Sequence, residues 1–152
     1  SIFSQCCVHF EVAKAITASS ELSDSFLGGD TDLQMADCGS ATTEELNMLR
    51  GARTAVGLTS RIKVFYVASM TPSAQGSSTS SLCATGQRAP LRDMVVMMNG
   101  LSQRVLAHEF AHILMNTFAD HSVRTDNIQH IDQGATGDKL EPVQCGIIFA
   151  RS

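Results

Sequence analysis

The spacing of apolar residues changes along the chain between helical and extended periods, and these changes divide it into elements. Apolar side chains recur every three or four positions over residues 3–19, which predicts an amphipathic helix. Residues 23–40 are then rich in turn-forming residues. A second helix is predicted to begin at a cap formed by Thr42 or Thr43 and to end at Gly57.

Two apolar stretches in the middle of the chain predict strands. Residues 62–69, IKVFYVAS, are rich in β-branched and aromatic side chains. Residues 93–98, DMVVMM, form a shorter apolar run that Asn99–Gly100 closes with a turn signal. The uncharged polar stretch 71–90 lies between them and is predicted to be a long loop.

The last third of the chain predicts two more helices. One begins at the cap residue Ser102 and ends near Asn116, and the other begins with Pro142 in its first turn. Residues 118–138 between them are polar and are predicted to be a loop. Helices and short strands in this order predict one α+β domain over residues 1–152, in which a small sheet packs on the 102–116 helix.

Composition limits the classes of protein to which the chain can belong. The chain has 152 residues, 43% of them hydrophobic, so a sizeable core can form. Charged residues make up 17% and the net charge is −4, which argues against a nucleic-acid partner. No apolar run reaches the roughly 18 residues of a membrane span. The sequence has no initiator Met and no signal-like segment, so we expect a processed protein or a domain of a longer parent chain.

The five cysteines indicate whether the protein acts in an oxidising or a reducing compartment. Their positions are 6, 7, 38, 83 and 145, and none of them forms a CxxC pair, which argues against a cysteine zinc site. Cys38 and Cys83 lie in polar, glycine-containing stretches, so we predict at least one disulfide that involves one of them. Such a bridge implies an oxidising compartment; the alternative is five reduced thiols.

The stretch VLAHEFAHILMN contains the strongest chemical signal. His108 and His112 are four residues apart, so on a helix both face the same side, one turn apart. Two imidazoles at that spacing can bind one Zn²⁺ at about 2.0–2.1 Å each. Glu109 projects beside them and can accept the proton of a zinc-bound water as it attacks a carbonyl. The alternative is a pair of structural histidines with an ion-paired glutamate.

The strand, the turn and the helix RVLAHEFAHIL resemble the active-site region of zincin metallopeptidases, and they are most similar to the metzincin clan and its bacterial relatives. The resemblance covers residues 93–116 firmly and 117–152 more loosely. It implies a zincin-like α+β domain with a small mixed sheet. Met115 and Phe118 stand where metzincins have a glycine and a third histidine. No methionine follows Met115, and Asn127–Ile128–Gln129 occupies the place of the metzincin Met-turn.

A catalytic zinc takes a third protein ligand, and the choice here is His121. Asn116 tolerates the left-handed conformation that ends helices, so the chain can turn back and bring His121 to the metal. Some bacterial metzincin-like proteins have such a longer spacer that ends in a histidine. Asp120 is predicted to accept a hydrogen bond from an imidazole N–H. The alternative ligands are Asp120, Asp126, His130, Asp132 and Glu141.

These features predict a zinc-dependent endopeptidase that hydrolyses peptide bonds by Glu109-assisted attack of a zinc-bound water. Its substrate is a peptide or protein. The resemblance implies that an extended substrate adds to the sheet at an edge strand, for which 93–98 is the candidate. The resemblance implies action outside the producing cell or in a cell envelope, as a secreted enzyme, toxin or effector. The alternatives are a non-catalytic zinc-binding interaction module and a cell-wall peptide amidase. An inhibitor or a parent chain would be a further partner.

Overall fold

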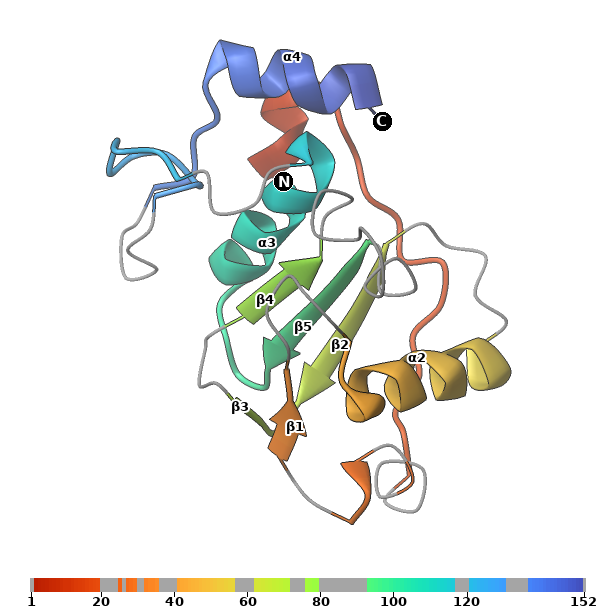
Figure 1. Cartoon of the computed structure of the whole chain (residues 1–152). Coiled ribbons are helices and arrows are strands. Elements are labelled where there is room, and N and C mark those ends of the chain that lie inside the picture. Colours follow the sequence, from red (N-terminus) through yellow and green to blue (C-terminus); the bar gives the residue numbers. More distant parts are fainter. Residues whose placement is uncertain are drawn as a thin grey trace.

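A small sheet with a helix on each face forms the centre of the molecule (Figure 1). The protein is seen in a computed structural model. The structure describes residues 2–19, 25, 27–29, 32–35, 41–56, 62–71, 76–79, 93–116, 121–130 and 137–151. The sheet has the order β2–β5–β4, with β2 at Lys63–Val67, β5 at Met94–Met98 and β4 at Gly76–Thr79. β2 is parallel to β5 and β4 is antiparallel to it, so the sheet is mixed.

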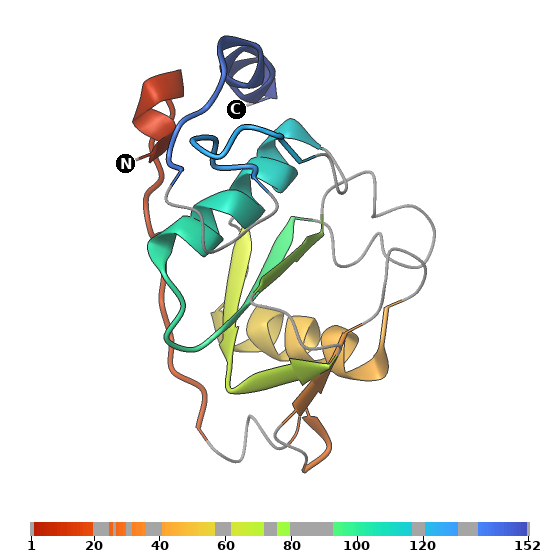
Figure 2. The same ribbon diagram turned by 90° about the vertical axis from the view of Figure 1, so that its left-hand side faces the viewer.

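Strand β5 lies in the middle of this sheet and is buried on both faces. Val95 and Met97 pack against the helix α3 (Gln103–Met115), while Met94 and Val96 pack towards the helix α2 (Thr43–Val56). Figure 2 shows the two helices on opposite sides of the sheet. The prediction that a small sheet packs on the 102–116 helix is confirmed.

The prediction that 93–98 is an edge strand is wrong. β5 pairs with a strand on each side, and its residues 94–97 are almost fully buried. An uninterrupted apolar run fits a strand that is covered on both faces, whereas a half-exposed edge would alternate with polar residues. Among the described strands, β4 is the edge on one side and β2 the edge on the other.

Two short strands lie where loop was predicted. Within 71–90, residues 76–79 form β4, and Thr71 ends the strand β3 (Ser69–Thr71). Within the turn-rich stretch, Asp32–Gln34 forms β1, which pairs in parallel with β3. Residues 72–75 and 80–90 lie outside the described part of the chain. Polar three- and four-residue strands leave almost no periodic signal, because their pairing partners are distant in sequence.

The helix α2 begins as predicted. Its cap is Thr42, whose Oγ1 accepts a hydrogen bond from the Glu45 N–H (3.1 Å), while Glu45 Oε2 accepts one from the Thr42 N–H (2.8 Å). This reciprocal capping box satisfies two of the N–H groups that a helix start leaves unpaired. Gly57, the predicted end, lies outside the described residues, and the last described helical residue is Val56.

The predicted helix over 3–19 is wrong. Only a short 3₁₀ helix, η1 (Ile2–Cys6), forms, and residues 8–19 run on without regular structure. Cys7 has a φ of 58°, a left-handed conformation that interrupts a right-handed helix. The Phe10 ring packs on Phe110 of α3 at a centroid distance of 4.8 Å. Val12 remains 83% exposed, so the apolar spacing here does not mark a buried helix face.

The C-terminal helix α4 (Pro142–Arg151) begins at Pro142 as predicted and is linked to the N-terminal segment. A disulfide joins Cys6 of η1 to Cys145 of α4, and Cys7 is a free, exposed thiol. Cys38 and Cys83, the cysteines predicted to form a bridge, lie outside the described residues. Within the described ranges, none of the helices has the length and apolar character needed to cross a membrane.

Candidate metal centre

The helix α3 buries three polar side chains in an otherwise apolar setting. His108, Glu109 and His112 are 1%, 6% and 7% exposed. The two imidazoles lie one turn apart, with ring centroids 4.8 Å apart and their Nε2 atoms separated by 3.1 Å. Burying polar groups costs free energy, which contacts with their partners must offset.

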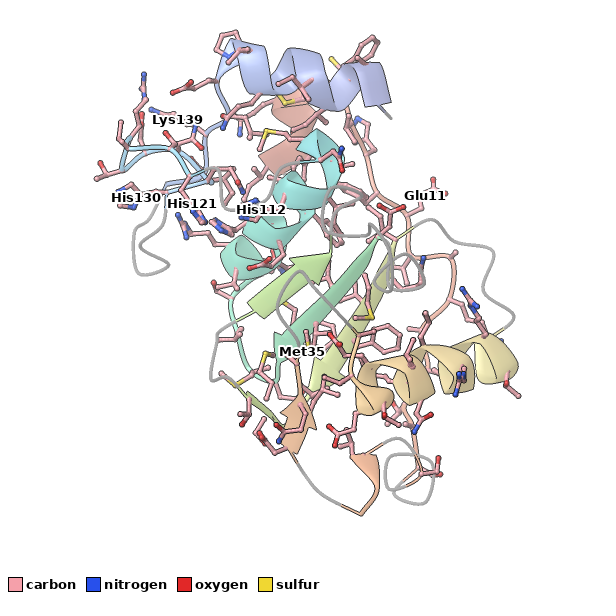
Figure 3. All side chains as sticks on the ribbon, in the orientation of Figure 1. Glu11, Met35, His112, His121, His130 and Lys139 are labelled. Atoms are coloured by element: carbon pink, nitrogen blue, oxygen red, sulfur yellow. A yellow bond between two sulfur atoms is a disulfide. The ribbon has the colours of Figure 1, made fainter. Side chains whose placement is uncertain are left out.

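The end of α3 directs the chain back towards these histidines. Asn116 is left-handed, with φ 55° and ψ 45°, and its N–H bonds to the carbonyls of His112 and Ile113. His121 then returns to the helix, and its ring centroid lies 5.2 Å from that of His108 and 5.1 Å from that of His112. Figure 3 shows His112 and His121 next to each other. The predicted left-handed end of the helix at Asn116 is confirmed.

The three histidines form a group that can hold a metal ion. One nitrogen from each of His108, His112 and His121 lies within 4.8 Å of the others. Two nitrogens bound at about 2.0–2.1 Å to one tetrahedral ion stand roughly 3.3–3.4 Å apart. The 3.1 Å between the Nε2 atoms of His108 and His112 is close to that value, so a small ion fits between them.

A hydrogen bond fixes which nitrogen of His108 faces the cluster. Its Nδ1 lies 2.8 Å from the main-chain oxygen of Ile128, which can only accept. Nδ1 therefore carries the proton, and the Nε2 lone pair points to the partner histidines. A ligating imidazole that donates its other N–H to a carbonyl is the usual arrangement around protein-bound metals.

Both helix histidines are held neutral. Burial lowers the pKa of His108 to about 4, against a smaller raising effect of its hydrogen bond to Ile128, and His121 lowers it further. Burial, followed by the charges of His108 and His121, lowers the pKa of His112 to about 3. Neutral imidazoles are the form that binds metal, so the pair is ready to bind at neutral pH.

The segment 127–129 contacts His108 from outside the helix α3. Asn127, Ile128 and Gln129 are at most 1% exposed, and Gln129 Nε2 donates to the His108 carbonyl at 2.7 Å. Gly137 lets a neighbouring stretch approach this segment, since a Cβ there would lie 2.5 Å from the main-chain carbon of Asp126. The sequence related this segment to the place of the metzincin Met-turn only through the family resemblance, and its contacts with His108 were not predicted.

The remaining candidate ligands do not join the cluster within the described part of the chain. Asp126 pairs with Arg124 and Lys139, and Glu141 lies 3.7 Å from Arg124. His130 forms an isolated bridge with Ser122 and is labelled beside His121 in Figure 3. Asp120 and Asp132, with the predicted role of Asp120 as an imidazole partner, lie outside the described residues.

Comparisons with known proteins give no relative. No protein-family model matches the chain, no curated protein matches its sequence, and no solved structure matches its fold. The assignment of the site therefore depends on the geometry and chemistry of its own residues.

Proposed function

We propose that the chain is a zinc-dependent endopeptidase in which His108, His112 and His121 hold the metal and Glu109 moves the proton. The observation that carries this proposal is the three-histidine group on α3 and the segment after it, with a buried carboxylate between the two helix histidines in sequence. A purely structural zinc site does not require a glutamate at that position.

The ligand set favours zinc in a catalytic setting. Three protein ligands leave a fourth tetrahedral position open, whereas structural zinc sites are closed by four protein ligands, often cysteines. The described residues contribute no fourth histidine, cysteine or carboxylate to the group. A bound zinc ion would polarise the substrate carbonyl and lower the pKa of a water molecule to about 7.

Glu109 would act as the general base and then as the general acid. It follows His108 directly on α3, so its carboxylate starts one residue from the ligand cluster. It accepts a proton from the attacking water and passes it to the amine that leaves when the peptide bond breaks. Glu109 returns to its starting protonation state, because the proton that it takes from water is the one that it gives to the amine.

An extended substrate would pair with β4. This strand is antiparallel to β5, contacts α3 and has no partner on its outer side among the described strands. A peptide that adds to an exposed edge gains main-chain hydrogen bonds whatever its side chains are. β4 replaces the 93–98 strand as the expected substrate edge, since that strand is central.

We further propose that the protein acts outside the producing cell or in a cell envelope, as a secreted or delivered effector. The Cys6–Cys145 disulfide supports this, because disulfides persist mainly in oxidising compartments.

The test is a pair of matched glutamate substitutions. Glu109→Gln keeps the side-chain volume and removes the base, so the zinc-loaded variant should keep its metal and lose amide hydrolysis by roughly 10²–10⁴-fold. Glu141→Gln is the control, because Glu141 lies beside Arg124 and outside the histidine group. Peptide cleavage by Glu109→Gln at the parent rate would exclude Glu109 as the base.

A further inference from the structure

Gln129 has a side chain that is buried but only half hydrogen-bonded. It is fully buried, and its Nε2 donates to the main-chain carbonyl of His108 at 2.7 Å. Its Oε1 is buried too and has no hydrogen-bond partner among the described residues. The amide orientation follows from chemistry, because a carbonyl such as that of His108 can accept from Nε2 but not from Oε1.

Two consecutive residues therefore contact His108 at two different places. Ile128 accepts a hydrogen bond from the His108 ring through its main-chain oxygen, at 2.8 Å. Gln129 donates to the His108 backbone from the next position along the chain. One bond orients the ring and the other fixes the helix backbone that carries it, so together they set where Nε2 of His108 lies.

Gln129 is itself held by a chain of amides that starts on α4. Asn127 Oδ1 accepts a hydrogen bond from the Gln129 N–H at 2.8 Å. Asn127 Nδ2 donates to Gln144 Oε1 on α4, also at 2.8 Å. The position of Gln129 thus follows from that of a separate helix and does not depend on the metal-binding helix alone.

We propose that Gln129 is a positioning residue of the metal centre, which holds His108 in the orientation that binds the ion. This inference rests on the proposed three-histidine metal centre and does not depend on peptidase activity. Partners of metal ligands that make such contacts change metal affinity by roughly 10–100-fold when they are removed.

Because Oε1 of Gln129 is unpaired, an experiment can distinguish a positioning role of this residue from a contribution to folding. A methionine has similar length and no polar atoms, so Gln129→Met removes the bond to His108 and also removes a buried acceptor without a partner. Losing the bond to the His108 carbonyl costs stability, and removing a buried acceptor without a partner offsets that loss, whereas the ligand is still loosened. The metal-free variant should therefore be as stable as the parent while it binds metal more weakly.

The experiment uses the whole chain with Zn²⁺ and Co²⁺ as probes, and compares Gln129→Met and Gln129→Leu with Gln5→Met. Gln5 is a matched control, since its Nε2 also donates to a main-chain carbonyl at 2.7 Å, that of Asp138, and neither residue belongs to the histidine group. We expect the Gln129 variants to raise Kd by roughly 10–100-fold, to change the visible Co²⁺ spectrum and to keep the metal-free Tm. Gln5→Met should leave Kd and spectrum unchanged.

Two results would overturn the inference. One is a Kd for both Gln129 variants within about twofold of the parent value, against the roughly 10–100-fold expected. The other is a weaker affinity that accompanies a lower metal-free Tm, with a Co²⁺ spectrum like that of the parent, which would make Gln129 a folding residue. A parent chain that binds neither ion would instead overturn the metal centre itself.

Discussion

At the scale of single residues, the helix α3 carries a cost that a bound metal ion would offset. His108 and His112 are buried side by side with their Nε2 atoms 3.1 Å apart, and burial depresses the pKa of both. Without an ion, the two nitrogens can share one hydrogen bond, in which the N–H of one ring donates to the lone pair of the other. Metal that binds the folded chain and not the unfolded chain then adds directly to its stability.

The depressed pKa values predict how the stability of the metal-free chain depends on pH. Unfolded histidines take up protons near pH 6.5, whereas His108 and His112 do so only near pH 4 and pH 3 when folded. The unfolded state therefore binds more protons below pH 6.5, and folding stability falls as the pH drops from 6.5 towards 4. Urea midpoints measured in chelator at pH 7, 6 and 5 should decrease in that order.

The control for this pH dependence is His112→Gln, which removes one of the two titrating groups and should flatten the slope. Equal urea midpoints at pH 7 and pH 5 in the parent chain would contradict the buried, neutral histidine pair.

At the scale of elements, the parts of the site that could be predicted are those whose causes are local. The spacing of His108 and His112 is a property of one helix, and Asn116 ends that helix by its own tolerance of positive φ. Met70 and the other buried residues of β3 and β5 show the opposite case, because their burial depends on strands and helices far away in sequence.

The wrong predictions concern segments whose structure depends on parts of the chain that are distant in sequence. Strand β4 is polar and pairs with β5 across a long connection, so no local period marks it. The N-terminal stretch has helical spacing, yet the Cys6–Cys145 bridge and the contact of Phe10 with Phe110 hold it in another path. Gln129 carries no chemical signature in sequence, and only the fold brings its amide to His108.

At the scale of the whole molecule, a disulfide joins two segments near the ends of the chain, and both segments pack on the helix α3. The disulfide Cys6–Cys145 spans 139 residues and connects η1 to α4. Phe3, Ala111 and Ile148 belong to one core cluster, so η1, α3 and α4 share their packing. The helix that carries the histidines is thereby supported by both termini of the described chain.

Loss of this bridge should lower stability more than any surface change. A loop of this length predicts a loss of about 2–5 kcal/mol in the free energy of unfolding when Cys6 and Cys145 are both changed to serine. Denaturant unfolding of the double variant and the parent measures the difference. Cys7→Ser is the matched control, because Cys7 is exposed and unbridged, and it should leave the unfolding midpoint unchanged. Unfolding of the double variant at the parent midpoint would contradict the bridge.

The central claim, that three histidines hold one catalytic zinc, is tested most directly by zinc X-ray absorption with metal analysis of the parent, His121→Ala and His130→Ala. The account predicts about one zinc per parent chain, bound by three imidazole nitrogens at about 2.0–2.1 Å. His121→Ala should lose one of these nitrogens and release zinc more readily to a chelator, while His130→Ala should match the parent. A parent chain that takes up no zinc, or zinc that is lost from His130→Ala and kept by His121→Ala, would contradict it.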